Sequence, residues 1–140
     1  MIPWTISELH PLFIHFPIAL FSTGLFFDML YRIIKNDEFN KVGFWMMLMG
    51  LISSFFAILS GFIVFINEAD IFDLIQFQHG YTQILICINL LILFIIRIIY
   101  ELEIKYSIYK QNIFLIVHIL SILLLFFSSH LGAIASNRLN

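Results

Sequence analysis

Charged side chains are scarce in this sequence of 140 residues: 11% are charged, 61% are hydrophobic, and the mean hydropathy is +1.01. A water-soluble domain of this size needs more polar surface, so the composition predicts a membrane protein that lies in a lipid bilayer. No stretch rich in glycine, proline or serine and no run of like charges interrupts the chain. We therefore expect a single domain over residues 1–140.

Cysteine is almost absent as well. The single one, Cys87, lies in an apolar run, which excludes a disulfide framework, a c-type haem attachment motif and a cysteine metal cage. The first ten residues lack the basic region and the cleavage site of a signal peptide, so we expect the first helix to stay in the bilayer. The chain has no basic patch for nucleic acid outside its short loops. It also has no nucleophile–base pair, which favours an electron-transfer or structural subunit over a stand-alone enzyme.

Long apolar runs are what the sequence has in abundance. A bilayer core about 30 Å thick needs roughly 20 apolar residues in a helix, and four such runs are present. The runs are continuous rather than alternating, which excludes strands, and short connections make successive helices antiparallel. We therefore predict an all-α membrane protein, an up-and-down bundle of four transmembrane helices at about residues 11–33, 42–66, 74–100 and 112–135.

The lysines and arginines are divided unevenly between the two sides of the predicted bundle. Six of the seven fall on the side of the first and third loops, and Arg138 alone falls on the other side. Positively charged residues favour the cytoplasmic side of a membrane, so both termini are predicted to lie on the outer side. The six residues are Arg32, Lys35, Lys41, Arg97, Lys105 and Lys110.

In this topology, four of the five histidines lie near the outer side. With about 100° per residue in a helix, His15 shares a face with the small residues Ala19 and Ser22. By the same count, His79 shares a face with Gln83. Polar and small side chains point inward in membrane bundles, so we expect both imidazoles to face the bundle interior, with a structural hydrogen bond as the alternative role.

Two facing imidazoles at similar depth are typical of a haem site. The first and third helices of an up-and-down ring are diagonal, so His15 and His79 would face one another across the core. A bis-imidazole haem needs one neutral nitrogen on each side of a flat macrocycle in an apolar pocket. We therefore predict that His15 and His79 are the axial ligands of one haem b.

Two further residues are expected beside this site. His10 precedes Pro11, which suits a first helical turn, so His10 is interpreted as a helix cap or as a partner for a haem propionate. Gly61 is the outermost member of a small-residue stripe in the second helix. Such a stripe either packs against a neighbouring helix or leaves room for the flat haem ring to lie against Gly61.

The remaining polar residues of the spans are less defined. His130 is rotated by roughly 120° or more from the small-residue face of the last helix, so it either points along a seam or requires a bend there. His118 stands alone toward the cytoplasmic side and is interpreted as a buried, hydrogen-bonded residue. Asp28 and Arg32 are four residues apart, the spacing of an ion pair within one helix.

Several segments resemble a widespread bacterial family of small predicted membrane proteins, catalogued as a domain of unknown function. HPLFIHFPIA matches the signature with which that family opens, H-P-x-x-[VI]-H-F-P-I-A, and AILSGF, QHG and SSHLGA resemble its shorter segments in the next three helices. The resemblance covers nearly the whole chain. It implies a multi-pass protein of the bacterial inner membrane, with signature positions at His10, His15, His79 and His130. Some relatives are joined to c-type cytochrome domains, which implies periplasmic electron transfer.

These observations converge on a membrane cytochrome b-like module with one haem b near its outer face. The module would pass electrons between a periplasmic c-type cytochrome and a quinol-linked membrane complex, with His130 as an alternative ligand. Two other hypotheses stay open. One is a copper or zinc site formed by His15, His79 and His130, for metal handling or sensing. The other is a purely structural subunit of a larger complex, and a homo-oligomer is compatible with each hypothesis.

Overall fold

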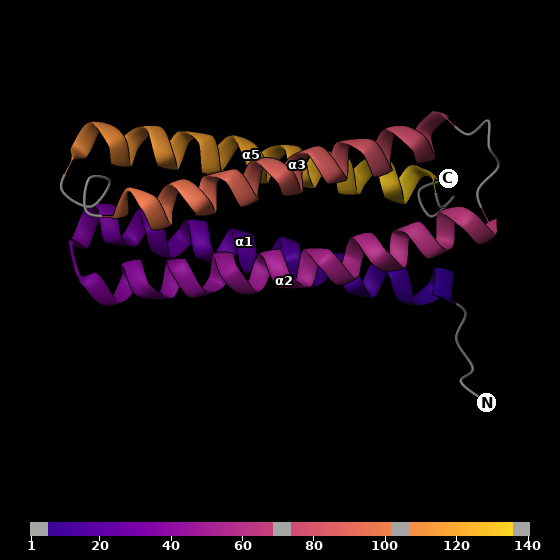
Figure 1. The fold of residues 1–140 in the computed structure, drawn as a ribbon, viewed down its shortest axis with the longest axis horizontal. Helices are drawn as coiled ribbons and strands as arrows, with labels where there is room; N and C mark the ends of the chain where they lie inside the picture. Colours follow the sequence, from indigo (N-terminus) through magenta and orange to yellow (C-terminus); the bar gives the residue numbers. More distant parts are fainter. Residues whose placement is uncertain (1–5, 69–73, 102–106, 136–140) are drawn as a thin grey trace.

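The computed structural model describes residues 6–68, 74–101 and 107–135. These residues form four helices and, within those ranges, no strand: α1 (Ile6–Ile34), α2 (Asp37–Glu68), α3 (Leu74–Ile99) and α5 (Ile108–Ala135). The helices run up and down beside one another (Figure 1). All four are long and apolar enough to cross a membrane, so the prediction of an all-α, multi-pass membrane protein is confirmed.

Three of the four helices, α1, α2 and α5, extend beyond the apolar runs that predicted them, whereas α3 keeps the predicted bounds to within one residue. The first turn of α2 is an example, because it begins at Asp37 rather than near residue 42. The backbone N–H of Glu38 donates to Asn36 Oδ1 at 3.0 Å, and acidic side chains in a first turn complement the helix dipole. Hydropathy marks the part of a helix that lies in hydrocarbon, whereas the helix itself continues into its polar flanks.

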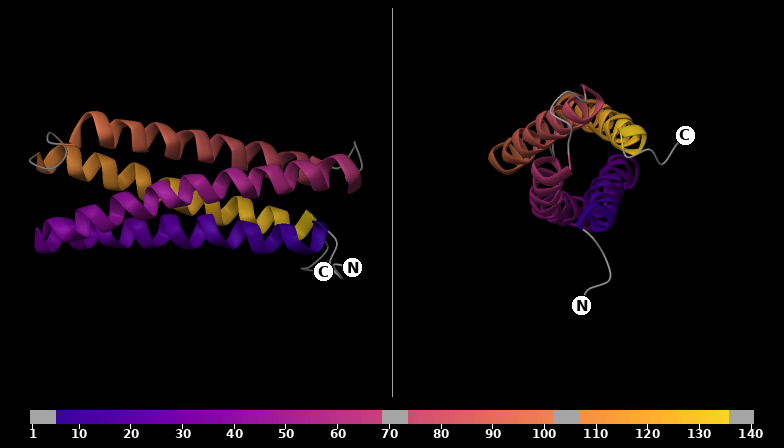
Figure 2. Two further views of the ribbon diagram at one scale, coloured as in Figure 1. Left: turned by 60° about the horizontal axis from the view of Figure 1, so that its bottom comes forward. Right: turned by 90° about the vertical axis from the view of Figure 1, so that its right-hand side faces the viewer.

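The four helices form a ring with α1 and α3 at opposite corners (Figure 2). α1 packs mainly against α2, and α3 packs mainly against α5. These two pairs meet along α1–α5 and along α2–α3, as an up-and-down bundle requires. A contact between α1 and α3 therefore has to be made across the bundle axis.

The middle of the bundle is apolar. Each helix contributes one fully buried large side chain, and these are Phe21, Met47, Leu90 and Leu125. The outward-facing side chains are mostly large and hydrophobic as well, which suits contact with lipid tails.

The buried face of α1 follows a spacing of three and four residues, which is the seam of a coiled coil. Gly24 lies on this seam, and a Cβ built there would come within 3.3 Å of Met46 Cβ. The two helices therefore approach closely at this point. The buried members of the seam are Pro17, Phe21, Gly24, Asp28 and Tyr31.

Candidate functional site

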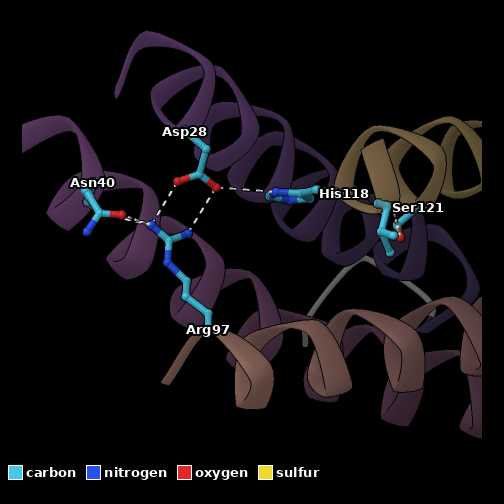
Figure 3. A network of polar contacts seen from close by, with 6 residues as sticks. Asp28, Asn40, Arg97, His118 and Ser121 are labelled. Atoms are coloured by element: carbon cyan, nitrogen blue, oxygen red, sulfur yellow. Dashed lines mark hydrogen bonds and ion pairs between the residues drawn. The ribbon is translucent and has the colours of Figure 1, made fainter. Parts of the chain in front are cut away.

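An ion pair crosses the bundle axis near the turn between α1 and α2. Arg97 of α3 donates from Nη1 to Asp28 Oδ2 of α1 at 3.0 Å, and its Nη2 lies 2.8 Å from Asp28 Oδ1 (Figure 3). The side chains of both residues are 6% exposed. Arg97 Nη2 also donates to the backbone oxygen of Asn40 in α2 at 2.8 Å and to its Oδ1 at 2.9 Å. The guanidinium therefore ties α1, α2 and α3 together.

The last helix reaches this ion pair through a histidine. His118 of α5 is fully buried, and its Nδ1 lies 3.4 Å from Asp28 Oδ2. This distance is longer than a normal hydrogen bond, and neither ring nitrogen has a hydrogen-bond partner among the described residues. Asp28, Asn40, Arg97 and His118 thus bring one polar side chain from each helix to one level of the bundle. We call these four residues the charged cluster.

Close packing and a small cavity surround the charged cluster. A Cβ built on Gly43 of α2 would overlap Asp28 Oδ1 and would lie 3.3 Å from Arg97 Nη2, so α2 approaches the ion pair through a residue without a side chain. A cavity of about 30 Å³ adjoins the pair. Its lining consists of Asp28, Tyr31, Arg32, Asn40, Arg97, Glu101, Gln111, Phe114 and Leu115.

The charged cluster differs from what the sequence predicted. The spacing of Asp28 and Arg32 indicated an ion pair within α1, and that prediction is wrong: Asp28 pairs with Arg97, and Arg32 Nε donates to Asn112 Oδ1 at 3.1 Å. Arg97 was counted only as a marker of the cytoplasmic side. A buried charge costs several kcal/mol in a bilayer unless it is paired, and this signal alone could have directed Asp28 toward a basic partner on another helix.

At the other end of the bundle, His10 of α1 packs against α2. A Cβ built on Gly61 would lie 2.8 Å from His10 Cε1, so the imidazole lies directly over this glycine. Ser60 Oγ donates to the carbonyl oxygen of Ala57 at 2.9 Å, which uses the hydroxyl proton. The 2.9 Å contact between His10 Nδ1 and Ser60 Oγ is therefore a bond that the histidine donates. The tautomer with the proton on Nδ1 leaves the lone pair on Nε2.

His79 of α3 has a corresponding arrangement on α5. A Cβ built on Gly132 would lie 2.7 Å from His79 Cε1 and 2.9 Å from its Nε2. His79 Nδ1 lies 2.7 Å from the carbonyl oxygen of Ser128, and a carbonyl can only accept, so Nδ1 again carries the proton. The Ser128 hydroxyl in turn donates to the carbonyl oxygen of His79 at 3.3 Å. We call His10, Gly61, His79 and Gly132 the histidine end.

A common spacing relates the two ends. Asp28 follows His10 by eighteen residues, and Arg97 follows His79 by the same eighteen. Eighteen residues are five turns of 3.6 residues, so each histidine lies on the same face of its helix as the charged residue. Asp28 and Arg97 meet on the bundle axis, and the faces that carry His10 and His79 are therefore the ones that α1 and α3 turn toward the interior.

The structure does not bring the other predicted ligands to this end. His15 is exposed, and its Nδ1 contacts the carbonyl oxygen of Pro11 in its own helix. The prediction that His15 faces His79 across the core is therefore wrong, because His15 lies about 140° around α1 from the face of Asp28. His130 is exposed too, in a helix that continues to Ala135.

Two expectations about the surroundings of this end also change. His10 was expected at the rim, but it is half-buried against α2, and the flat ring that lies on Gly61 is the imidazole of His10 itself. Arg138 lies outside the described residues.

Across the described ranges, no group of three or more histidine, cysteine or acidic residues is placed to hold a metal ion, so the three-histidine copper or zinc site gains no support. The ligand roles of the histidines stay predictions.

The comparison with known proteins agrees with this architecture. No curated protein and no solved structure matches the chain. A family model described as "Predicted membrane protein (DUF2231)" matches residues 7–140, which is nearly the whole sequence and includes all four helices. The chain therefore belongs to the DUF2231 family of predicted membrane proteins.

Proposed function

We propose that this protein is an electron-transfer module of the bacterial inner membrane that binds one haem b at its histidine end, through His10 and His79. The observation that carries the proposal is that the two imidazoles have the same tautomer and the same kind of hydrogen bond. Each has its Nδ1 proton bonded to an oxygen of the neighbouring helix, and this tautomer makes Nε2 the basic nitrogen, the one that would bind a haem iron. The proposal replaces His15 by His10 as the ligand from α1.

The donor set fits a haem better than it fits a bare copper or zinc ion. Two neutral imidazoles from diagonal helices, His10 and His79, would be sufficient to hold a haem, whereas a catalytic or structural zinc site needs at least three protein ligands. When bound, the haem would supply a one-electron couple. Hydrogen bonds from a ligand histidine to a backbone or side-chain oxygen are typical of metal sites, because they fix the tautomer and the direction of the ring.

The protein's own residues would hold the two rings in place before the haem binds. Ser60 and the carbonyl of Ser128 orient the Nδ1 side of each imidazole. Gly61 and Gly132 provide the space in which the rings lie, since a Cβ at either position would come within 3.0 Å of a ring atom. The apolar layer of Phe21, Leu90 and its neighbours closes the site toward the middle of the membrane. Electrons would be exchanged on the outer side with a c-type cytochrome or a quinol-linked complex.

Absorption spectroscopy tests this proposal directly. The protein is produced with a haem precursor, purified in detergent, and measured in its oxidised and dithionite-reduced states. We expect a Soret band that shifts on reduction, and we expect His10→Ala and His79→Ala to lose it. His15→Ala is the matched control, because His15 belongs to the same helix but is exposed, and this variant should keep the spectrum.

Two outcomes would contradict the proposal. Wild-type protein that carries no haem when haem is supplied would leave the structural-subunit hypothesis, provided that metal analysis also finds no copper or zinc. Loss of the spectrum in His15→Ala with retention in His10→Ala would return the ligand role to His15. Stoichiometric copper or zinc without a Soret band would favour metal handling.

A further inference from the structure

We infer that His118 and Asp28 form a proton-accepting pair inside the membrane, with the proton as ligand and hydronium in the adjoining water as its source. This inference concerns the charged cluster and does not depend on haem at the histidine end. It starts from one observation: His118 is fully buried, yet neither of its ring nitrogens has a hydrogen-bond partner among the described residues. An imidazole in that position is costly if its role is packing alone.

The carboxylate of Asp28 determines the state of the ring. Asp28 Oδ2 lies 3.4 Å from His118 Nδ1, and an ionised carboxylate can only accept a hydrogen bond. The proton of the neutral ring is therefore on Nδ1, where a small movement completes the bond to Asp28. The lone pair is left on Nε2 as a base. An acid that orients a histidine from its Nδ1 side and stabilises the imidazolium is the arrangement that enzymes use for general bases.

The charged groups around His118 balance one another, so His118 can accept one more proton. Asp28 of α1 and Arg97 of α3 form a neutral pair beside His118, and Arg32 and Glu101, which have opposite charges, line the adjoining cavity. α2 contributes the neutral amide of Asn40. A proton added to Nε2 makes an imidazolium whose charge faces Asp28 Oδ2. The proton comes from a hydronium ion in the adjoining water: one O–H bond breaks as the Nε2–H bond forms, and a neutral water molecule is left.

Water can reach this position from the end of the bundle. The cavity of about 30 Å³ is lined by Asp28 and also by Glu101, which is exposed at the bundle end. That volume is enough for one water molecule. Phe114 lines the same cavity, and its ring packs edge-on against His118 with ring centroids 5.9 Å apart. The Phe114 side chain therefore borders both the cavity and the ring of His118.

Nitrogen NMR of the histidine rings tests the pair. Each of the five histidines follows a different residue type, and His118 alone follows a valine. Labelling valine carbonyl carbon and histidine nitrogen therefore identifies His118 without a substitution. In wild-type protein in lipid nanodiscs, we expect His118 to show a protonated Nδ1 and an unprotonated Nε2 at neutral pH, and we expect Nε2 to gain a proton on acidification. His10→Ala is the control for independence from haem, and it should leave the His118 signals unchanged.

Two variants separate this role from a structural one. Asp28→Asn, or D28N/R97Q if the single variant does not fold, removes the carboxylate, and we expect the ratio of Nδ1–H to Nε2–H tautomers to fall by about tenfold. Phe114→Ala should accelerate hydrogen exchange at the ring. The inference is overturned if wild-type His118 carries its proton on Nε2. It is also overturned if Nε2 stays unprotonated over the whole pH range in which the bundle remains folded.

Discussion

Replacing Arg97 by methionine should destabilise the bundle more than any other single change near the turn between α1 and α2. Arg97 makes two contacts with the carboxylate of Asp28, at 3.0 and 2.8 Å, and both side chains are 6% exposed. Removing one partner of a buried ion pair costs about 3–5 kcal/mol, because the other charge stays buried without compensation. In Arg97→Met the polar group left beside Asp28 is His118, at 3.4 Å, so we expect a value in the upper part of that range.

The two single variants should differ, and their combination should be milder than the worse of them. In Asp28→Asn, Arg97 keeps its two contacts with Asn40, so this variant should lose about 1 kcal/mol less than Arg97→Met. In D28N/R97M both charges of the ion pair are removed, and the double variant should be more stable than Arg97→Met alone. Reversible unfolding in mixed micelles with increasing dodecyl sulfate, followed by circular dichroism, gives the four free energies of unfolding. Two results together would refute this account of the cluster. They are a loss of unfolding free energy below about 1 kcal/mol in each single variant, and a loss in the double variant that equals the sum of the two within about 0.5 kcal/mol.

The glycines supply two further predictions. Gly132→Ala should displace the ring of His79 and weaken haem retention at the histidine end, because the new Cβ would lie 2.7 Å from a ring atom. Gly80→Ala is the control and should retain haem, because a Cβ there has nothing within 4 Å. Equal haem retention in both variants would contradict this prediction. Gly50→Ala should destabilise the bundle by about 1–3 kcal/mol, because the new Cβ would lie 2.7 Å from the fully buried ring of Phe21. An unchanged free energy of unfolding in the same micelle assay would contradict this prediction and would show that the ring moves without cost.

The fold could be predicted because lipid imposes a strong and local rule. Each span had to be a continuous apolar run, and four runs with short connections leave little choice of topology. The interior faces of three helices also followed from small and polar residues. His118 on α5, for example, is buried as predicted, and His130, which was predicted to be rotated away from the small-residue face of that helix, is exposed.

The interior face of α1 was misjudged for a physical reason. The small residues Ala19 and Ser22 were taken to mark the interior, but the core at this level is filled by Phe21, and the close approach of α2 occurs at Gly24 instead. The charged residue was the better guide: counting back five turns from Asp28 leads to His10 rather than His15. Which basic residue pairs with Asp28 could not be read from one helix, because it depends on how the four helices are arranged around the axis.

The ion pair between Asp28 and Arg97 also has a consequence for biosynthesis. The two residues are 69 positions apart in the chain, and a ribosome that adds roughly 5–20 residues per second needs roughly 3–14 seconds to cover that distance. During this interval α1 carries an acidic group whose counter-charge has not yet been synthesised, and inserting such a group costs up to about 2.5–3.5 kcal/mol, the value for the centre of a membrane helix. α1 and α2 therefore leave the insertion machinery most easily in the company of α3, and the bundle assembles as one unit rather than one helix after another.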